Sequence, residues 1–193
     1  MPSKTNVISG RCDWCLGDDL YLDYHDNEWG SPMYDDRMLF EFLLLEGAQA
    51  GLSWITVLRK RENYSSAFDQ FDPEKIARYS KKKVQSLLQD AGIIRNKLKI
   101  NSAINNAQRY LDICSTGSFS DYIWRFVDGE PIQSRHKTMA DVPATTEISD
   151  LMAKTLKKAG FNFVGSTICY AFMQATGMVN DHLVGCFRHQ QCQ

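Results

Sequence analysis

Cysteine and histidine residues crowd the two ends of this chain, and these residue types bind metal ions. The six cysteines lie at positions 12, 15, 114, 169, 186 and 192, and the four histidines at positions 25, 136, 182 and 189. Zinc prefers four such ligands in a tetrahedron. His182 and Cys186 are four residues apart and would share one face of a helix. Cys12 and His25 could complete a site from the N-terminal segment.

The spacing alone leaves other interpretations open. Residues 12–15 form a Cys-x-x-Cys run, and His189 with Cys192 is a further close pair. Free cysteines also pack as small apolar side chains, which suits Cys114 and Cys169 because both lie in helical stretches. In a reducing compartment this combination indicates metal or packing rather than disulfides. The residues therefore predict a site that joins the chain ends without selecting its ligands.

A carboxylate among aromatic residues forms the second group. Glu46 lies near the end of a strongly apolar stretch, so a charged side chain there is conspicuous. Planar rings around a carboxylate can hold a flat, hydrogen-bonding or cationic ligand by stacking and charge. The alternative is an aromatic core with Glu46 at a helix end that faces water. The aromatic members of the group are Trp14, Tyr21, Tyr24, Trp29 and Trp54.

A glycine-containing turn between two helical stretches is the third group. Gly92 and Ile93 lie in this turn, and Arg95, Lys97 and Lys99 follow it. Such a turn can direct backbone N–H groups at the start of the second helix toward a phosphate, and the helix dipole there favours an anion. Short helical hairpins with glycine are common, so this pattern alone does not identify a phosphate site.

The elements that must position these groups are helical. Apolar residues recur at helical spacing and no stretch alternates like a strand, so the sequence predicts an all-α fold. Residues 128–146 are polar and are expected to form a long loop. In the helix after the turn, Leu98 is expected to open the apolar stripe. Helices are predicted over residues 35–49, 53–68, 96–113, 122–127, 148–159 and 164–176, with helix starts at Asp72 and Ser80 and a helix stop at Gly92.

Composition sets the class of protein. The chain has 193 residues, of which 44% are hydrophobic, with 12 Gly and 5 Pro, and this favours one globular domain over residues 1–193. We expect a core over 11–187 with frayed ends at roughly 1–10 and 188–193. A net charge of −1 provides no long-range attraction to polyanions, so nucleic-acid binding would need a local patch. No apolar run suits a membrane span or a signal peptide, which predicts a cytoplasmic protein.

Five segments of the chain also resemble a known family. In order, they are residues 24–30 (YHDNEWG), 45–54 (LEGAQAGLSW), 90–95 (DAGIIR), 165–170 (GSTICY) and 179–182 (VNDH). Together they resemble the DNA-3-methyladenine glycosylase I family, from about residue 11 to residue 186. The resemblance implies the all-helical fold of the helix-hairpin-helix DNA glycosylase superfamily, with a zinc site that joins the N- and C-terminal segments.

The resemblance also selects one set of metal ligands. It implies that Cys12, His25, His182 and Cys186 bind one structural Zn²⁺ per chain. The remaining candidates, Cys15, His189 and Cys192, then have no assigned role. A site with four protein ligands leaves no open position for water, so the metal is not expected to take part in catalysis.

The activity that the resemblance implies is base-excision DNA repair. Such an enzyme hydrolyses the N-glycosidic bond of 3-methyladenine in alkylated double-stranded DNA after the base has been flipped out of the helix. By resemblance, Glu46 is the catalytic residue, accepting hydrogen bonds from the exocyclic amine and complementing the charge of the base. Tyr24 and Trp54 are expected to bind the base, with Trp14 and Tyr21 as further walls of the pocket.

Contacts to the DNA backbone and to the gap in the helix are implied as well. Gly51 and Leu52 follow the pocket helix, and Leu52 is expected to act as an apolar wedge, although an ordinary core leucine is the alternative. The hairpin is expected to hold phosphates without reading sequence. Its expected DNA-binding residues are Gly92, Ile93, Arg95 and Lys97.

We expect a monomeric and monofunctional glycosylase that does not cut the strand. Asp112 is only a weak counterpart of the catalytic aspartate of the superfamily, and neither Lys97 nor Lys99 clearly takes a Schiff-base position. Two other classes remain as alternatives: a zinc-stabilised helical protein that binds damaged DNA without turnover, and an unrelated metalloenzyme. Release of the free base separates the first from the enzyme, and the second predicts that chelation abolishes activity without unfolding.

Overall fold

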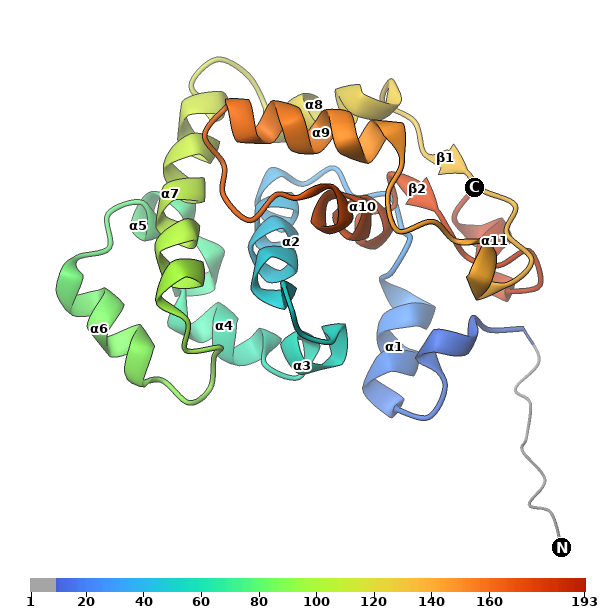
Figure 1. The fold of residues 1–193 in the computed structure, drawn as a ribbon, viewed down its shortest axis with the longest axis horizontal. Helices are drawn as coiled ribbons and strands as arrows, with labels where there is room; N and C mark the ends of the chain where they lie inside the picture. Colours follow the sequence, from blue (N-terminus) through green and yellow to red (C-terminus); the bar gives the residue numbers. More distant parts are fainter. Residues whose placement is uncertain (1–9) are drawn as a thin grey trace, which may run out of the picture.

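A strongly apolar helix lies at the centre of the molecule. The structure, a computed structural model, describes residues 10–193. Helix α2 (Asp36–Gln49) begins where Asp35 accepts a hydrogen bond from the Met38 amide, and it buries most of its residues. It contacts α3 (Trp54–Leu58), α7 (Lys97–Cys114), α8 (Phe119–Trp124) and α10 (Ser166–Ala175), which lie around it (Figure 1). The prediction of a buried central helix with Glu46 near its end is confirmed.

Both ends of the described chain meet on one side of the molecule. The N-terminal elements are η1 (Asp13–Cys15) and α1 (Asp19–Asn27), and the last helix is α11 (Phe187–Gln191). The Phe187 amide donates to the Gly10 carbonyl over 2.8 Å. Figure 1 shows α1 and α11 on this side, away from α6 and α7.

The predicted fraying at the C-terminal end is wrong. Residues 187–191 form helix α11, and the side chains of His189 and Cys192 are buried. Asn180 holds this helix by donating to the His189 carbonyl over 2.9 Å. The expected fraying of the N-terminus falls almost entirely on residues 1–9, which lie outside the described residues.

The single helix predicted over 53–68 is two helices. Helix α3 ends at Leu58, and α4 (Arg61–Ala67) begins after Lys60, whose φ of −106° and ψ of 0° are not helical. The chain continues through η2 (Asp69–Phe71) and α5 (Pro73–Ile76). Asp72 caps α5 as predicted, by accepting from the amides of the next turn.

Helices α6 (Lys81–Gln89) and α7 form the predicted helical hairpin. Ser80 caps α6, and Asn96 caps α7 by accepting from the Leu98 and Lys99 amides. Helix α6 stops at Gln89 rather than at Gly92, because the Asp90 carboxylate takes the Gly92 amide instead, over 2.7 Å. The expectation for Leu98 is also wrong: this side chain is 69% exposed, and the buried stripe of α7 begins at Ile100.

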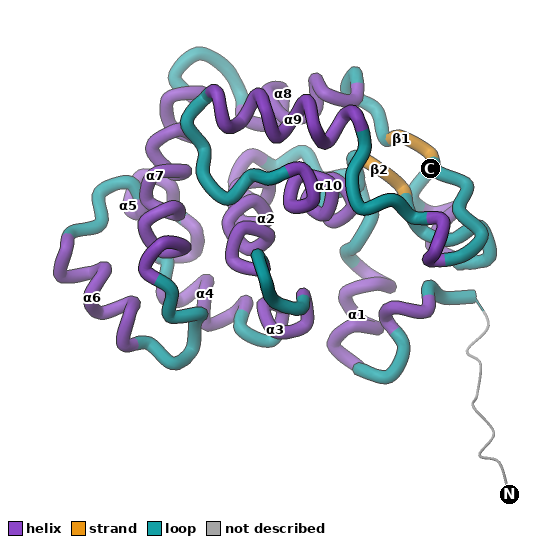
Figure 2. The backbone as a smooth tube through the Cα atoms, viewed as in Figure 1, coloured by secondary structure: helices purple, strands orange, loops and turns teal. Residues whose placement is uncertain are grey.

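The fold is mostly helical rather than entirely so. The region predicted as a loop contains strand β1 (Ile132–Gln133), which pairs in parallel with β2 (Val179–Asn180), and the short helix η4 (Met139–Asp141) (Figure 2). Strands of two residues are too short to show a period of two in the sequence. Helix α8 continues into η3 (Arg125–Val127), and α9 (Glu147–Lys158) packs on α10. In residues 10–193, every helix is too short or too polar to cross a membrane.

Candidate functional site

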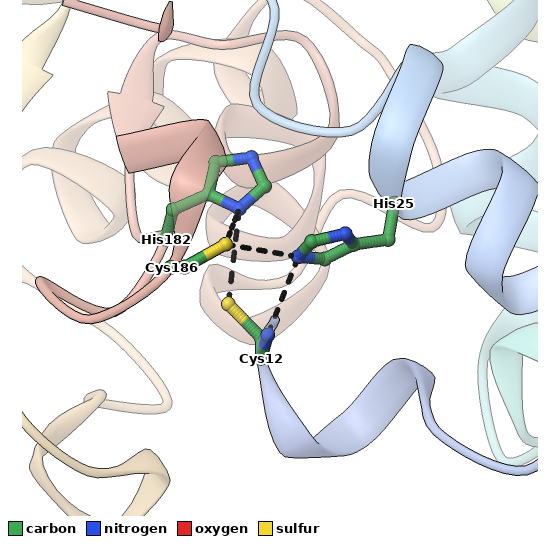
Figure 3. A group of neighbouring side chains, drawn as sticks. All are labelled: Cys12, His25, His182 and Cys186. Atoms are coloured by element: carbon green, nitrogen blue, oxygen red, sulfur yellow. Dashed lines mark hydrogen bonds between the residues drawn. The ribbon is translucent and has the colours of Figure 1, made fainter. Parts of the chain in front are cut away.

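Four metal-binding side chains lie together where the chain ends meet. Cys12, His25, His182 and Cys186 are all buried, and one ligand atom from each lies within 4.8 Å of the others. Figure 3 shows the two thiols and the two imidazoles turned toward one another. The structure therefore brings together the four residues that the resemblance selected.

The spacing of these atoms fits a tetrahedral zinc site. With Zn–S bonds of about 2.3 Å and Zn–N bonds of about 2.0–2.1 Å, sulfur and nitrogen ligands are about 3.6 Å apart. The Cys12 Sγ lies 3.7 Å from the His182 Nδ1. The Cys186 Sγ lies 3.6 Å from the same atom and 3.4 Å from the His25 Nε2. The hydrogen bond between the two thiols lowers the pKa of Cys186 and raises the pKa of Cys12, so Cys186 is the thiol of the pair that ionises first.

The other nitrogen of each imidazole is held by the protein. His25 Nδ1 donates to the Asp26 carboxylate over 2.8 Å, and His182 Nε2 donates to the Trp29 carbonyl over 3.0 Å. Such partners fix the ring orientation and the tautomer of a metal ligand. Gly30 allows the close approach, because a Cβ at this position would lie 2.8 Å from His182 Nε2. The surroundings thus orient both histidines toward the centre of the cluster.

One geometric expectation for the cluster is wrong. His182 and Cys186 do not share a helical face, because both lie in the segment between β2 and α11. The other cysteine and histidine candidates make different contacts. Cys15 donates to the Cys12 carbonyl over 3.0 Å, and His189 pairs with the Ser134 carbonyl over 2.9 Å.

A cavity of about 190 Å³ lies beside the cluster. All five pocket residues expected from the resemblance line it, and they come from η1, α1, α2 and α3. They are Trp14, Tyr21, Tyr24, Glu46 and Trp54. The aromatic rings meet mostly edge to face: the Trp14 and Tyr21 centroids are 5.3 Å apart at 89°. The alternative of a filled aromatic core is therefore wrong, since the rings enclose a space.

Three polar atoms at this cavity have no partner within the described part of the chain. They are the Tyr24 hydroxyl, the Glu46 Oε2 and the Trp54 Nε1, all of them buried. Burial raises the pKa of Glu46 to about 8. Burial, and then the neighbouring Glu46, raises the pKa of Tyr24, which keeps its hydroxyl neutral. Because unpaired buried polar groups cost stability, such a set is characteristic of a site that pairs with a ligand.

Five further residues, which the site prediction did not include, also line the cavity. Two of them could have been identified from the sequence. Trp29 belongs to the aromatic group around Glu46, and Gln49 is three residues after Glu46 on the same helix. The other three come from η4 and α10, and no feature of the sequence marked them as site residues. These residues are Trp29, Gln49, Met139, Ala171 and Gln174.

The Gln174 side chain is held by a buried carboxylate. Asp181 accepts from Gln174 Nε2 over 2.9 Å and from the Tyr170 hydroxyl over 2.6 Å with the same oxygen. His136 Nε2 lies 3.3 Å from its other oxygen. Asp181 takes one of the two N–H donors of the Gln174 amide, which leaves the carbonyl oxygen and the second N–H for a ligand.

The metal cluster supports the walls of the cavity. Trp14 lies two residues after Cys12, and its ring packs edge-on against Trp29 at 5.0 Å. The Trp29 ring packs in turn against His182 at 4.6 Å. Tyr21 also has a structural contact, since its hydroxyl accepts from the Ile55 amide over 2.9 Å and so positions the start of α3. The aromatic walls therefore depend on the joining of the chain ends.

The turn after α2 and the hairpin lie at the surface. Gly51 has a φ of +77°, and Leu52 is 42% exposed, so the alternative of a core leucine is wrong. Arg95 and Lys97 are exposed as well. Ile93 is 3% exposed and its side chain packs in the core, so any contact it makes with DNA must come from its backbone.

None of the three weak catalytic candidates on α7, Lys97, Lys99 and Asp112, lines the cavity. Asp112 pairs with Arg109 over 3.2 Å, with its side chain 64% exposed. Lys99 donates to carbonyls at the end of α2. Among residues 10–193, Glu46 is the one carboxylate of the cavity lining, which contains no lysine.

Comparisons with known proteins agree with this arrangement. Residues 14–189 match the model of the methyladenine glycosylase family. The DNA-3-methyladenine glycosylase 1 of Escherichia coli K12 is 54% identical over 177 residues, which make up 91% of this chain and 95% of the relative. The DNA-3-methyladenine glycosylase of Haemophilus influenzae is 49% identical over 180 residues, or 93% and 97% of the two chains.

Solved structures show the same fold. A crystal structure of a 3-methyladenine DNA glycosylase I has a TM-score of 0.90 at 55% identity and covers 92% of this chain and 98% of its own. The Staphylococcus aureus enzyme has a TM-score of 0.89 at 36% identity, with 92% and 95% covered. These matches define the class of the protein: it is a DNA glycosylase, a hydrolase of N-glycosyl bonds. Within that class, the chain belongs to the methyladenine glycosylase family.

The raised pKa of Glu46 predicts how stability depends on pH. Since the folded pKa of about 8 exceeds the unfolded value, protonation stabilises the fold below the unfolded pKa, and this contribution is lost as pH rises through about 8. Glu46→Gln cannot ionise. Relative to wild type, we expect it to gain up to a few kcal/mol in free energy of unfolding between about pH 5 and about pH 9, measured by urea denaturation.

The control for this experiment is Glu62→Gln, which removes one carboxyl from an exposed helix surface. Subtracting the free energy of unfolding of wild type at each pH removes effects of pH on the four-residue cluster, because both variants keep its residues. A difference between Glu46→Gln and wild type that stays constant with pH would show that burial does not set the ionisation of this group.

Proposed function

We propose that this protein excises 3-methyladenine from alkylated double-stranded DNA after flipping the base into the aromatic cavity. One observation carries the proposal: a hydroxyl, a carboxyl and an indole N–H are buried unpaired around one cavity. A flat base with polar edges would pair with these atoms and stack on the rings. The relatives are named for 3-methyladenine, and one structure with a TM-score of 0.88 at 36% identity, covering 92% of this chain and 96% of its own, is a complex with that base.

The damaged base is cationic while it is joined to the sugar. When the glycosidic bond breaks, the bonding electrons pass to the base, which leaves neutral. The electron-poor sugar carbon then bonds to the oxygen of a water molecule, which gives up a proton to the solvent. The leaving group therefore needs little protonation. In this proposal, Glu46 accepts a hydrogen bond from the exocyclic amine and stabilises the positive charge, first of the base and then of the sugar.

In this proposal, burial of Glu46 also discriminates alkylated adenine from ordinary adenine. With a pKa of about 8, the carboxyl is mostly protonated at neutral pH in the free protein. A cationic base next to it favours the carboxylate, because opposite charges attract strongly where water is excluded. Ordinary adenine is neutral and offers no such compensation. The pocket therefore prefers the alkylated base without needing contacts that adenine lacks.

The surface elements supply the remaining contacts in this proposal. Leu52, presented by the turn at Gly51, enters the gap left by the flipped base. Arg95 and Lys97 contact phosphates, together with the backbone at Gly92 and Ile93. The Gly92 amide already donates to Asp90, so the two basic side chains contribute most of this interaction.

The cluster of Cys12, His25, His182 and Cys186 would hold one structural zinc ion. The tetrahedral spacing and the fixed imidazoles support this assignment. When bound, the metal supplies a crosslink between the chain ends and no open position for a reacting water. We further infer a single domain over residues 1–193, since the buried apolar residues form one core cluster, and we propose that it acts as a monomer.

Release of the free base tests the activity. Wild type should liberate 3-methyladenine from dimethyl-sulfate-treated duplex DNA, and Glu46→Gln should lower the single-turnover rate about 100-fold with the fold intact. The strand should stay uncut and borohydride should trap no adduct, because the cavity lining has no lysine. Glu62→Gln is the matched control and should behave as wild type.

Two outcomes would contradict this proposal. Wild type that binds methylated DNA but releases no free base would support a damage-sensing protein instead. A covalent adduct after borohydride treatment would refute the monofunctional mechanism while leaving base excision in place.

Removal of the metal should act on stability first. We expect elemental analysis to find one zinc per chain and a chelator to lower the melting temperature by about 10 °C or more, since each kcal/mol lost costs about 2–4 °C in a chain of this size. Activity should fall with the folded fraction and recover on adding zinc. Cys12→Ser should lose the metal, whereas Cys15→Ser, a buried neighbour outside the cluster, should keep it. Activity that disappears at an unchanged melting temperature would indicate a catalytic metal.

A further inference from the structure

We propose that Lys99 is a positioning residue that fixes the turn carrying Leu52 relative to the hairpin. The inference rests on the proposed flipping of a base with Leu52 as the wedge. It assigns to Lys99 a role different from the phosphate contact that its place beside Arg95 and Lys97 suggests in the sequence. The role is mechanical: Lys99 sets where the wedge lies with respect to the element that holds the DNA backbone.

The Lys99 side chain points into the protein from the first turn of α7. Its ammonium donates to the Ala48 carbonyl over 2.7 Å and to the Ala50 carbonyl over 2.8 Å. Both acceptors belong to the C-terminal end of α2, where carbonyls have no partner within the helix and the helix dipole attracts a cation. Two of the three ammonium protons are thus engaged, and burial lowers the pKa of Lys99.

The turn beyond these carbonyls is short, and the next hydrogen bond to another element is the one from the Ile55 amide to Tyr21 at the start of α3. Leu52 follows Ala50 by two residues, and its amide donates back to the Gln49 carbonyl over 2.6 Å. A Cβ placed on Gly51 would meet no atom within 4 Å, so this part of the turn stands clear of the rest of the protein. The position of Leu52 therefore depends on how the end of α2 is held.

A second lysine joins the same two elements from the other direction. Lys60 lies just after α3, the helix that follows the turn. Its ammonium donates to the Ala91 carbonyl over 2.9 Å and to the Gly92 carbonyl over 3.3 Å, both in the hairpin. The turn is thus connected to the hairpin through Lys99 on its N-terminal side and through Lys60 on its C-terminal side.

This arrangement separates wedge placement from base recognition. Lys99 is not among the residues that line the aromatic cavity. It acts on α2 beyond Glu46, at the last carbonyls of the helix. Losing its two hydrogen bonds should let the turn shift relative to the hairpin, and misplacement by about 1 Å can cost about 100-fold in rate. Gln49 lies between the two acceptors and lines the cavity, but the unpaired polar groups of the pocket belong to residues outside this segment, so binding of a free base should be retained.

Lys99→Met tests this role because methionine keeps the length and apolar stem of the side chain without its donors. We expect the single-turnover excision rate on methylated duplex DNA to fall about 10- to 100-fold. The affinity for free 3-methyladenine, followed by tryptophan fluorescence, should match wild type. A 2-aminopurine beside an abasic-site analogue should brighten less on binding, because the wedge no longer enters correctly.

Lys154→Met is the matched control. It makes the same lysine-to-methionine change at a surface site, because Lys154 is exposed in the middle of α9. Lys99→Arg keeps donors for both carbonyls and should recover much of the excision rate. This second variant keeps the test valid if Lys99→Met folds poorly.

Two results would overturn the inference. One is an excision rate and a 2-aminopurine signal for Lys99→Met equal to those of wild type. The other is a loss of free-base affinity as large as the loss of rate, which would mean that Lys99 supports the whole pocket. Wild type that releases no base at all would refute the proposed function instead.

Discussion

A carboxyl group held away from water at the end of the central helix is the constraint around which this structure is arranged. Glu46 is 2% exposed on a helix whose other buried residues are apolar. An ionisable group in such a place is unfavourable, and the pKa of about 8 is a direct consequence. The fold must therefore be stable enough elsewhere to tolerate it. Packing of α3, α7, α8 and α10 around α2 supplies that stability.

The cavity next to Glu46 needs rigid walls, and these come from segments that are far apart in the sequence. Trp14 and Trp29 belong to the first 30 residues, yet their rings pack against His25 and His182, two of the side chains that meet where the chain ends join. An open aromatic cavity would otherwise tend to collapse, since apolar rings bury more surface by closing onto one another. The cluster that joins the chain ends lies directly beside these walls, so the metal-type ligands and the cavity-lining rings are neighbours.

The sequence predicted which side chains meet better than it predicted the backbone that carries them. Cys12, His25, His182 and Cys186 could be named because few residue types bind zinc and the resemblance selected among them, but their placement outside a helix depends on the path of the chain between β2 and α11. Gln174 could not be found, because a glutamine becomes a site residue only through the buried Asp181 that orients it.

The direction in which a side chain points could not be predicted from the sequence either. Lys99 carries the same charge as Lys97 two residues earlier, and nothing in the spacing indicates that one points to solvent and the other toward α2. The two-residue strands were missed for a related reason. Their pairing joins segments more than 40 residues apart, and a local pattern of residues cannot encode it.

A net charge of −1 gives the selectivity of the proposed reaction a physical basis. Without a broad positive field, the protein cannot hold every stretch of DNA tightly, so discrimination falls to the pocket. There the ionisation of Glu46 is unfavourable unless a cation lies beside it. A neutral adenine that reached the cavity would stack on the rings but leave the carboxyl protonated, whereas a cationic base would stabilise the carboxylate in the same low-dielectric space. In the proposed reaction, the burial that makes Glu46 costly to the fold is thus the property that separates the damaged base from the intact one.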